Sequence, residues 1–152
     1  MQALARFDDP ECAPELLDWW VEQLGRWFTA GLGGVCCLAP QALSALQWQQ
    51  LIATCRRHHP HARFLAWTPG LPVEAIASLQ GAGFDAVFSS LPWWDFRAGW
   101  LFDEDARLRR VGRVIAPVEA PADAALASVH GSSPEQQHAA WRRRLLFAAL
   151  AA

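Results

Sequence analysis

The sequence predicts an α/β fold built on a parallel sheet, and three observations support this. Four apolar segments recur about 22 to 29 residues apart, at residues 33–40, 62–67, 84–90 and 113–121. The first of them, GGVCCLAP, is apolar throughout rather than alternating, which is typical of strands covered on both faces. Segments with helical signals separate them, and this period is typical of repeated right-handed βα units.

The first predicted element is a helix over about residues 10–30. Asp9 offers a side-chain cap, and Pro10 suits the first helical position. Apolar residues recur along the segment at helical spacing, and Gly31 ends it. The run GGVCCLAP at 33–40 is then the first predicted strand.

The next two units follow the same pattern. A helix is predicted over about residues 42–58, followed by a strand at 62–67. Pro72 opens a short helix that GAG at 81–83 closes, and the third strand follows at 84–90.

The last unit contains a polar helical stretch at 97–110 and a fourth strand at 113–121. Ser133, Pro134 and Gln136 form a capping-box pattern that opens a final helix, which we expect to run to the end of the chain. Four such strands fit either an open three-layer sheet or half of a (β/α)₈ barrel, and the period alone does not separate these folds.

Composition excludes several classes of protein. With 152 residues and 53% hydrophobic residues, we expect one domain over residues 1–152. A net charge of −2 argues against a nucleic-acid partner, and no apolar run approaches the roughly 20 residues that span a membrane. Four cysteines without CxxC spacing and an acidic N-terminus without a signal peptide predict reduced thiols and a cytoplasmic location.

Two clusters resemble chemical sites but have simpler interpretations. The HHPH run (His58, His59, His61) lies at a predicted helix end, where imidazoles suit the negative end of the dipole. Cys36 and Cys37 are adjacent in a strand, so they point to opposite faces and favour core packing over a redox pair. No metal and no cofactor are predicted.

Four blocks of sequence resemble the α-amylase superfamily, a glycoside hydrolase family 13-like group. They are AGLGGVCCLAP at 30–40, FLAWTPG at 64–70, GAGFDAVFSSLPWWDFRAGWL at 81–101 and VIAPVEAPAD at 114–123. Within the superfamily they are most similar to the maltosyltransferases that use maltose 1-phosphate to extend α-1,4-glucans. The resemblance implies a partial (β/α)₈ TIM barrel, about strands four to seven with their helices.

The resemblance also implies where three catalytic carboxylates belong. It places Leu38 at the nucleophile, Trp67 at the acid/base glutamate and Ala122 at the third aspartate, while Cys36 replaces a positioning arginine. Leucine, tryptophan and alanine side chains offer no proton and no attacking lone pair, so retaining glycosyl transfer is not expected. If the alignment at the seventh strand is shifted by one residue, Asp123 takes the place of the third aspartate. One carboxylate of three still does not support the mechanism.

Five residues are candidates for binding sugar. Trp93, Trp94 and Asp95 match a WWD motif in the resemblance, and together with Trp67 and Glu119 they could line a cleft for α-glucan or maltooligosaccharide. The structural alternatives are packing of the loop by the tryptophans and a salt bridge made by Glu119.

Three functions therefore stand side by side. The first is a catalytically degenerate segment that binds α-glucan. The second is a segment of an active maltosyltransferase or glycosidase of glycogen metabolism, completed by missing chain. The third is a structural module that covers its open sheet edges by self-association or with a partner segment. In a half barrel, we expect Val35, Cys37, Phe64 and Phe88 to be less covered than in a closed barrel.

Overall fold

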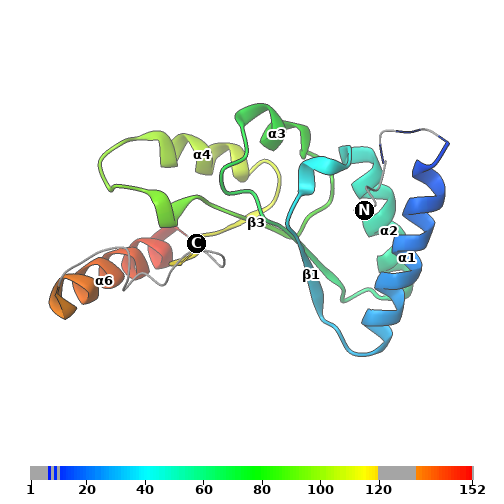
Figure 1. Ribbon diagram of the computed structural model, residues 1–152, viewed down its shortest axis with the longest axis horizontal. Coiled ribbons are helices and arrows are strands. Elements are labelled where there is room, and N and C mark those ends of the chain that lie inside the picture. Colours follow the sequence, from blue (N-terminus) through cyan, green and yellow to red (C-terminus); the bar gives the residue numbers. More distant parts are fainter. Residues whose placement is uncertain (1–6, 8, 10, 120–132, 152) are drawn as a thin grey trace, which may run out of the picture.

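The computed structural model describes residues 7, 9, 11–119 and 133–151. Helices and parallel strands alternate along the chain, as the apolar period predicted (Figure 1). The elements are α1 (Ala13–Thr29), β1 (Gly34–Cys37), η1 (Pro40–Ala42), α2 (Ala45–His58), β2 (Arg63–Ala66), α3 (Val73–Ser78), β3 (Ala86–Phe88), η2 (Leu91–Trp93), α4 (Trp100–Leu108), β4 (Arg113–Ile115) and α6 (Pro134–Ala151).

The four strands form one sheet in the order β1-β2-β3-β4, and every neighbouring pair is parallel. A doubly wound open sheet reverses its strand order at a switch point, whereas barrel strands follow one another in sequence. The sequential order therefore confirms the predicted α/β class and fits a partial (β/α) barrel.

The starts of α1 and α2 differ from the prediction by three residues. Asp9 does accept a hydrogen bond from the Glu11 amide at 3.0 Å, but α1 begins at Ala13. Before α2, Pro40–Ala42 form a separate 3₁₀ turn, so the helix begins after Ser44. That serine and Gln47 form a reciprocal capping box.

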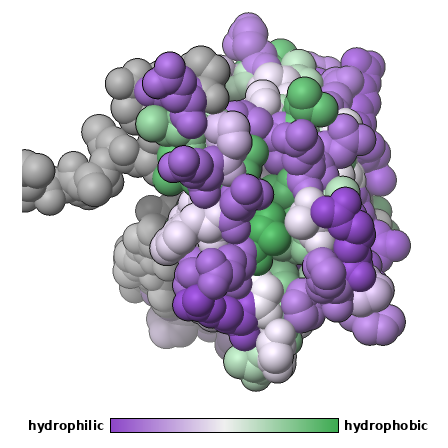
Figure 2. All heavy atoms as spheres, turned by 90° about the vertical axis from the view of Figure 1, so that its right-hand side faces the viewer, coloured by the Kyte–Doolittle hydropathy of each residue, from purple (hydrophilic) through white to green (hydrophobic). Residues whose placement is uncertain are grey.

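The main core lies between the sheet and the helices α1 and α2, which lie side by side at the right of Figure 1. Phe64, Ala66, Val87 and Val114 point from the strands into this core and are buried. On the α1 side of the molecule the surface is mostly hydrophilic, with a narrow band of hydrophobic side chains (Figure 2). The helix layer is therefore the solvated outside of the sheet.

The prediction that Phe64 would be poorly covered is wrong. Its side chain is 0% exposed and meets Phe28 of α1 edge to face, with 5.8 Å between ring centroids. Phe64 points to the helix side, together with the half-buried Val35 and Cys37. On the opposite, inner face of the sheet Phe88 is half-buried, and no helix from the described residues covers that face as α1 and α2 cover the other.

A second, smaller core lies beyond β3 and joins η2, α4 and α6. Leu91, Trp94 and Leu101 are its buried members, and Phe96 and Phe147 pack against them. As predicted, Ser133 precedes α6, and its hydroxyl accepts a hydrogen bond from the Gln136 amide at 3.3 Å. Among the described residues, no helix is both long and apolar enough to cross a membrane.

Candidate functional site

The C-terminal ends of the four strands meet at one edge of the sheet, where barrel enzymes build their active sites. Leu38 directly follows β1, Trp67 follows β2, and Ser89 and Ser90 follow β3. Glu119 lies four residues beyond the end of β4. The structure thus places the predicted nucleophile and acid/base positions at neighbouring strand ends.

Neither of those two side chains can transfer a proton. Leu38 is 74% exposed on the inner side of the sheet edge. Trp67 is half-buried, and its ring packs on Phe88 with 5.1 Å between centroids and 44° between planes. The Trp67 amide also donates to the Cys37 carbonyl at 2.9 Å, which extends the β1–β2 ladder to this residue.

A buried polar network ties the loops beyond β2 and β3 to helix α4. Glu104 of α4 is 8% exposed, and its carboxylate accepts hydrogen bonds from the Ser90 amide at 2.8 Å and the Ser90 hydroxyl at 2.6 Å. The Ser90 hydroxyl in turn accepts from the Gly70 amide at 3.4 Å. Gly70 has φ +78°, a conformation that side chains rarely tolerate. Nearby, the buried Thr68 hydroxyl donates to the Phe88 carbonyl.

This network forms the floor of an open groove of about 460 Å³. Residues 69–71 form one wall, and Ser90 and Glu104 lie at the base. Two tryptophans complete the lining: Trp93 of η2, which is 50% exposed, and Trp100 of α4, which is 38% exposed. Because the base is hydrogen-bonded, the groove combines two exposed aromatic surfaces with a rigid polar floor.

The structure separates Trp94 and Asp95 from this groove. Trp94 is 7% exposed and donates from its indole nitrogen to the Ala98 carbonyl at 2.6 Å. Asp95 is exposed and accepts hydrogen bonds from the Ala98 amide at 3.0 Å and the Arg97 amide at 2.9 Å, and both bonds lower the pKa of its carboxyl. Both residues line another pocket, of about 340 Å³, against α6.

Glu119 is exposed and is not among the residues that line the groove. It interacts electrostatically with Arg144 of α6, whose pKa is lowered by burial and raised by this carboxylate. Arg144 also donates to the Val118 carbonyl at 3.3 Å. These contacts agree with the structural alternative for Glu119. Ala122, the third catalytic position, lies outside the described residues, as does Asp123.

The opposite, N-terminal end of the sheet carries a charged cluster. The Asp85 carboxylate forms ion pairs with the guanidinium groups of Arg56 at 2.7 Å and Arg63 at 3.1 Å. It also accepts a hydrogen bond from the Phe64 amide at 2.7 Å. Burial raises the pKa of this carboxyl, but the amide and the two guanidinium groups outweigh it and hold the pKa below its usual value. Since conserved chemistry in barrels lies at the other end, this cluster stabilises the scaffold.

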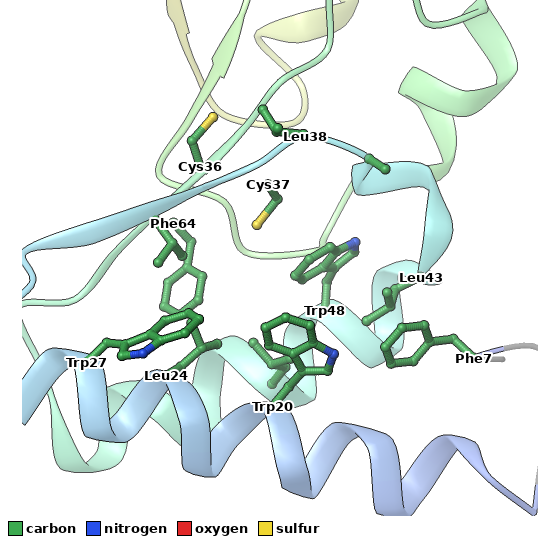
Figure 3. A pocket seen from close by; sticks show the side chains of 13 residues that line it. Phe7, Trp20, Leu24, Trp27, Cys36, Cys37, Leu38, Leu43, Trp48 and Phe64 are labelled. Carbon is green, nitrogen blue, oxygen red and sulfur yellow. The ribbon is translucent and has the colours of Figure 1, made fainter. Parts of the chain in front are cut away.

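A second, apolar pocket of about 440 Å³ lies on the helix side of β1, between α1 and α2 (Figure 3). Cys37 points into it, toward Trp20 and Trp48, while the Cys36 thiol points to the other side of the strand (Figure 3). The predicted opposite orientation of the two thiols is confirmed. Burial, with a smaller contribution from Cys36, raises the pKa of Cys37 to about 12, so its thiol remains protonated at neutral pH.

Within the described ranges, no group of three or more His, Cys, Asp and Glu side chains is arranged to hold a metal ion. His58 is the last residue of α2, as predicted, and the His59 amide donates to the Cys55 carbonyl at 2.9 Å. The His59 ring packs against Phe28 with 5.6 Å between centroids. The HHPH run therefore ends a helix.

Four sequential parallel strands, with α1 and α2 on the outside, define the chain as part of a (β/α) barrel. Comparison with known proteins identifies the relevant group. The chain is 42% identical over 135 residues, 88% of its length, to an α-1,4-glucan:maltose-1-phosphate maltosyltransferase of Burkholderia pseudomallei (strain K96243). The resemblance to α-amylase-superfamily maltosyltransferases is thereby confirmed over most of the chain. No family model and no solved structure matches.

The matched segment is only a small part of that relative. It spans 12% of the relative's length, as expected for a partial barrel. The activity of the whole relative therefore does not transfer to this chain without further argument.

Sequence reasoning did not find the groove itself. The pattern places Ser90 at the end of a predicted strand and Glu104 in a predicted polar helix. Nothing local in the sequence shows that these two residues, 14 positions apart, form a hydrogen bond. Trp100 lies in the most specific block of the resemblance, and that block was the available signal for it.

Proposed function

We propose that this chain binds α-glucan or maltooligosaccharide at the C-terminal edge of its sheet and does not cleave it. The observation that carries the proposal is the groove lined by Trp93 and Trp100 above the Ser90–Glu104 pair. Flat pyranose faces stack on exposed tryptophan rings, and sugar hydroxyls can donate to a fixed carboxylate. Trp67, held against Phe88, offers a further aromatic surface at the same edge.

Stacking needs only an aromatic face, whereas glycosyl transfer needs two carboxyl groups about 5 Å apart. The strand ends of β1 and β2 instead present Leu38 and Trp67. Glu104 does not replace the pair, because it is a single carboxylate on a residue that is only 8% exposed, and Ser90 already donates a hydrogen bond to each of its oxygens. The side chains at this edge thus favour binding of a sugar over cleavage or transfer of it.

The rival is a segment of an active maltosyltransferase, and the 42% identity to such an enzyme favours it. Since that rival is completed by missing chain, an assay of this chain tests the activity of the chain itself, and it uses the unmodified chain with maltose 1-phosphate and maltooligosaccharide. We expect no release of phosphate above the buffer blank. Release that disappears in Glu119→Gln would establish the active alternative.

Binding is tested by titrating the chain with maltoheptaose in a calorimeter. Trp93→Ala should weaken binding about fivefold, since one stacking contact contributes on the order of 1 kcal/mol. Trp19→Ala is the matched control, because Trp19 is 51% exposed but lies on α1, away from the groove. Equal losses in both variants, or no binding by the unmodified chain, would rule out the groove as the glucan site.

A further inference from the structure

The two outer edges of the sheet carry unpaired backbone groups. The Gly33 and Cys37 carbonyls accept from β2, so the backbone groups of Gly34 and Cys36 turn to the outer edge of β1. The Arg113 amide donates to the Asp85 carbonyl, and the Ile115 carbonyl accepts from the Ser89 amide. The backbone groups of Val114 therefore turn to the outer edge of β4. In the described part of the chain, no strand pairs with either edge.

Apolar surface is exposed beside the edge of β1. The pocket of about 440 Å³ is lined by all five residues from 35 to 39. Because successive strand side chains point to opposite faces, a pocket lined by all five reaches around the free edge of the strand. Trp27 of α1 also lines it and is 47% exposed. The strand itself, GVCC, carries no charge or proline of the kind that protects exposed edges.

The edge of β4 has a matching surface. A pocket of about 250 Å³ contains Val114 together with Phe147 and Leu150 of α6. Leu150 is 88% exposed and its neighbour Leu146 is 66% exposed. Both outer edges therefore lie beside helices that leave large apolar side chains in solvent.

The inner face of the sheet is also apolar. Cys36 is exposed there, and Leu65, Phe88 and Ile115 are half-buried. In a closed barrel these positions fill the interior in layers.

We infer that two copies of this chain associate edge to edge, with β4 of each copy pairing in parallel with β1 of the other. Four sequential parallel strands from each copy give eight, the number whose interior side chains fill a barrel. A two-fold axis along the barrel keeps every strand parallel and closes the ring, so no edge remains. α6 of one copy then lies beside α1 of the other, and the two exposed apolar surfaces cover each other. This inference concerns the sheet edges and does not depend on glucan binding.

Each of the two junctions joins unlike edges, β4 of one copy with β1 of the other, and this distinguishes the assembly from a dimer made through β1 alone. Two variants address the edges separately. Trp27→Arg places a charge in the exposed apolar surface beside β1, and Leu150→Arg places one beside β4. Both residues are exposed in the single chain, so neither change should disturb its fold. Leu46→Arg is the control, since Leu46 is 65% exposed on α2, away from both edges.

Sedimentation velocity over a range of protein concentrations measures the outcome. We expect a dimer for the unmodified chain and for Leu46→Arg, and a weakening of association by at least tenfold in each edge variant. Mixing the two edge variants should restore part of the dimer, because one intact β4–β1 junction then forms. Monomer at all concentrations, open-ended oligomers, or a Leu150→Arg variant that dimerises as well as the unmodified chain would overturn the inference.

Exchange of backbone amides gives a second readout on the unmodified chain. The Cys36 and Val114 amides should gain protection as the concentration rises through the dimerisation range, whereas the Trp67 amide, already bonded to Cys37, should not change. Unchanged protection at both edge amides would contradict the proposed pairing.

Discussion

The two ends of the sheet use polar groups in different ways. At the N-terminal end, Asp85 joins Arg56, Arg63 and a strand amide, and thereby ties β2, β3 and α2 together. At the C-terminal end, the strands end at Leu38 and Trp67, and the buried Glu104 is taken up by Ser90. The described charges near the strands therefore maintain the scaffold, whereas the edge where barrels perform chemistry presents mainly aromatic surface.

The largest expected effect is at the N-terminal end. Asp85→Asn leaves two guanidinium groups without their carboxylate and weakens the bond to the Phe64 amide. Removal of one partner from a buried ion pair costs about 3–5 kcal/mol, and since the side chain is 24% exposed we expect about 2–3 kcal/mol. Unfolding in urea measures this loss of unfolding free energy. Glu22→Gln, which breaks the exposed Glu22–Arg26 pair, should cost less than about 0.5 kcal/mol.

Acid should act on the same cluster. The folded-state pKa of Asp85 lies below its ordinary value of 3.8, so this stabilisation is present above pH 3.8 and is lost as the pH falls through the folded-state value. Asp85→Asn should therefore flatten the acid limb of a stability–pH curve. An unchanged acid limb would show that the cluster contributes nothing to stability.

A smaller effect is expected at the C-terminal end. Glu104→Gln retains the shape of the side chain but replaces an acceptor with a donor facing the Ser90 hydroxyl and amide. Hydrogen bonds to a charged group contribute about 1.5–3 kcal/mol, so we expect a loss of about 1–2 kcal/mol in unfolding free energy. Maltoheptaose binding should weaken in parallel, because the groove loses its fixed floor. Full retention of both stability and binding would show that the Ser90–Glu104 network supports neither the fold nor the groove.

Alkaline pH tests the buried thiol at the end of β1. The Cys37 pKa of about 12 lies above the ordinary 9.0, so its contribution to stability is full below pH 9 and falls as the pH rises toward 12. The loss should be about 1–2 kcal/mol at pH 10. Because the chain has no tyrosine and no lysine, few other groups titrate there. Cys37→Val should reduce the loss without abolishing it, since burial also raises the pKa of Cys36 and Cys55; an equally steep loss in this variant would count against a buried Cys37 thiol.

The smallest effect is expected at the position of the missing nucleophile. Leu38 is 74% exposed, so Leu38→Asp should change the unfolding free energy by less than about 0.5 kcal/mol. Combined with Trp67→Glu, it should still give no turnover of maltose 1-phosphate, because Cys36 stands where the positioning arginine belongs. Turnover by the double variant would show that the rest of the catalytic machinery is intact.

The order of elements and the parallel sheet could be predicted because apolar runs and helix signals act locally. The resemblance supplied the half-barrel interpretation that the period alone left open. The face of each strand could not be predicted: the runs are apolar on both sides, so nothing in FLAW showed that Phe64 points to the helices and Leu65 to the interior. Contacts such as Ser90 with Glu104 depend on how a loop meets a helix, and the sequence pattern does not encode that distance.

Hydrogen–deuterium exchange with and without maltoheptaose tests the contrast between the two ends most directly. The account predicts slower exchange on adding the sugar at residues 67–71 and 89–94, which surround the groove, and no change at residues 84–86 around Asp85. Protection at the N-terminal end alone, or identical exchange everywhere at saturating sugar, would contradict the claim that the C-terminal edge holds glucan.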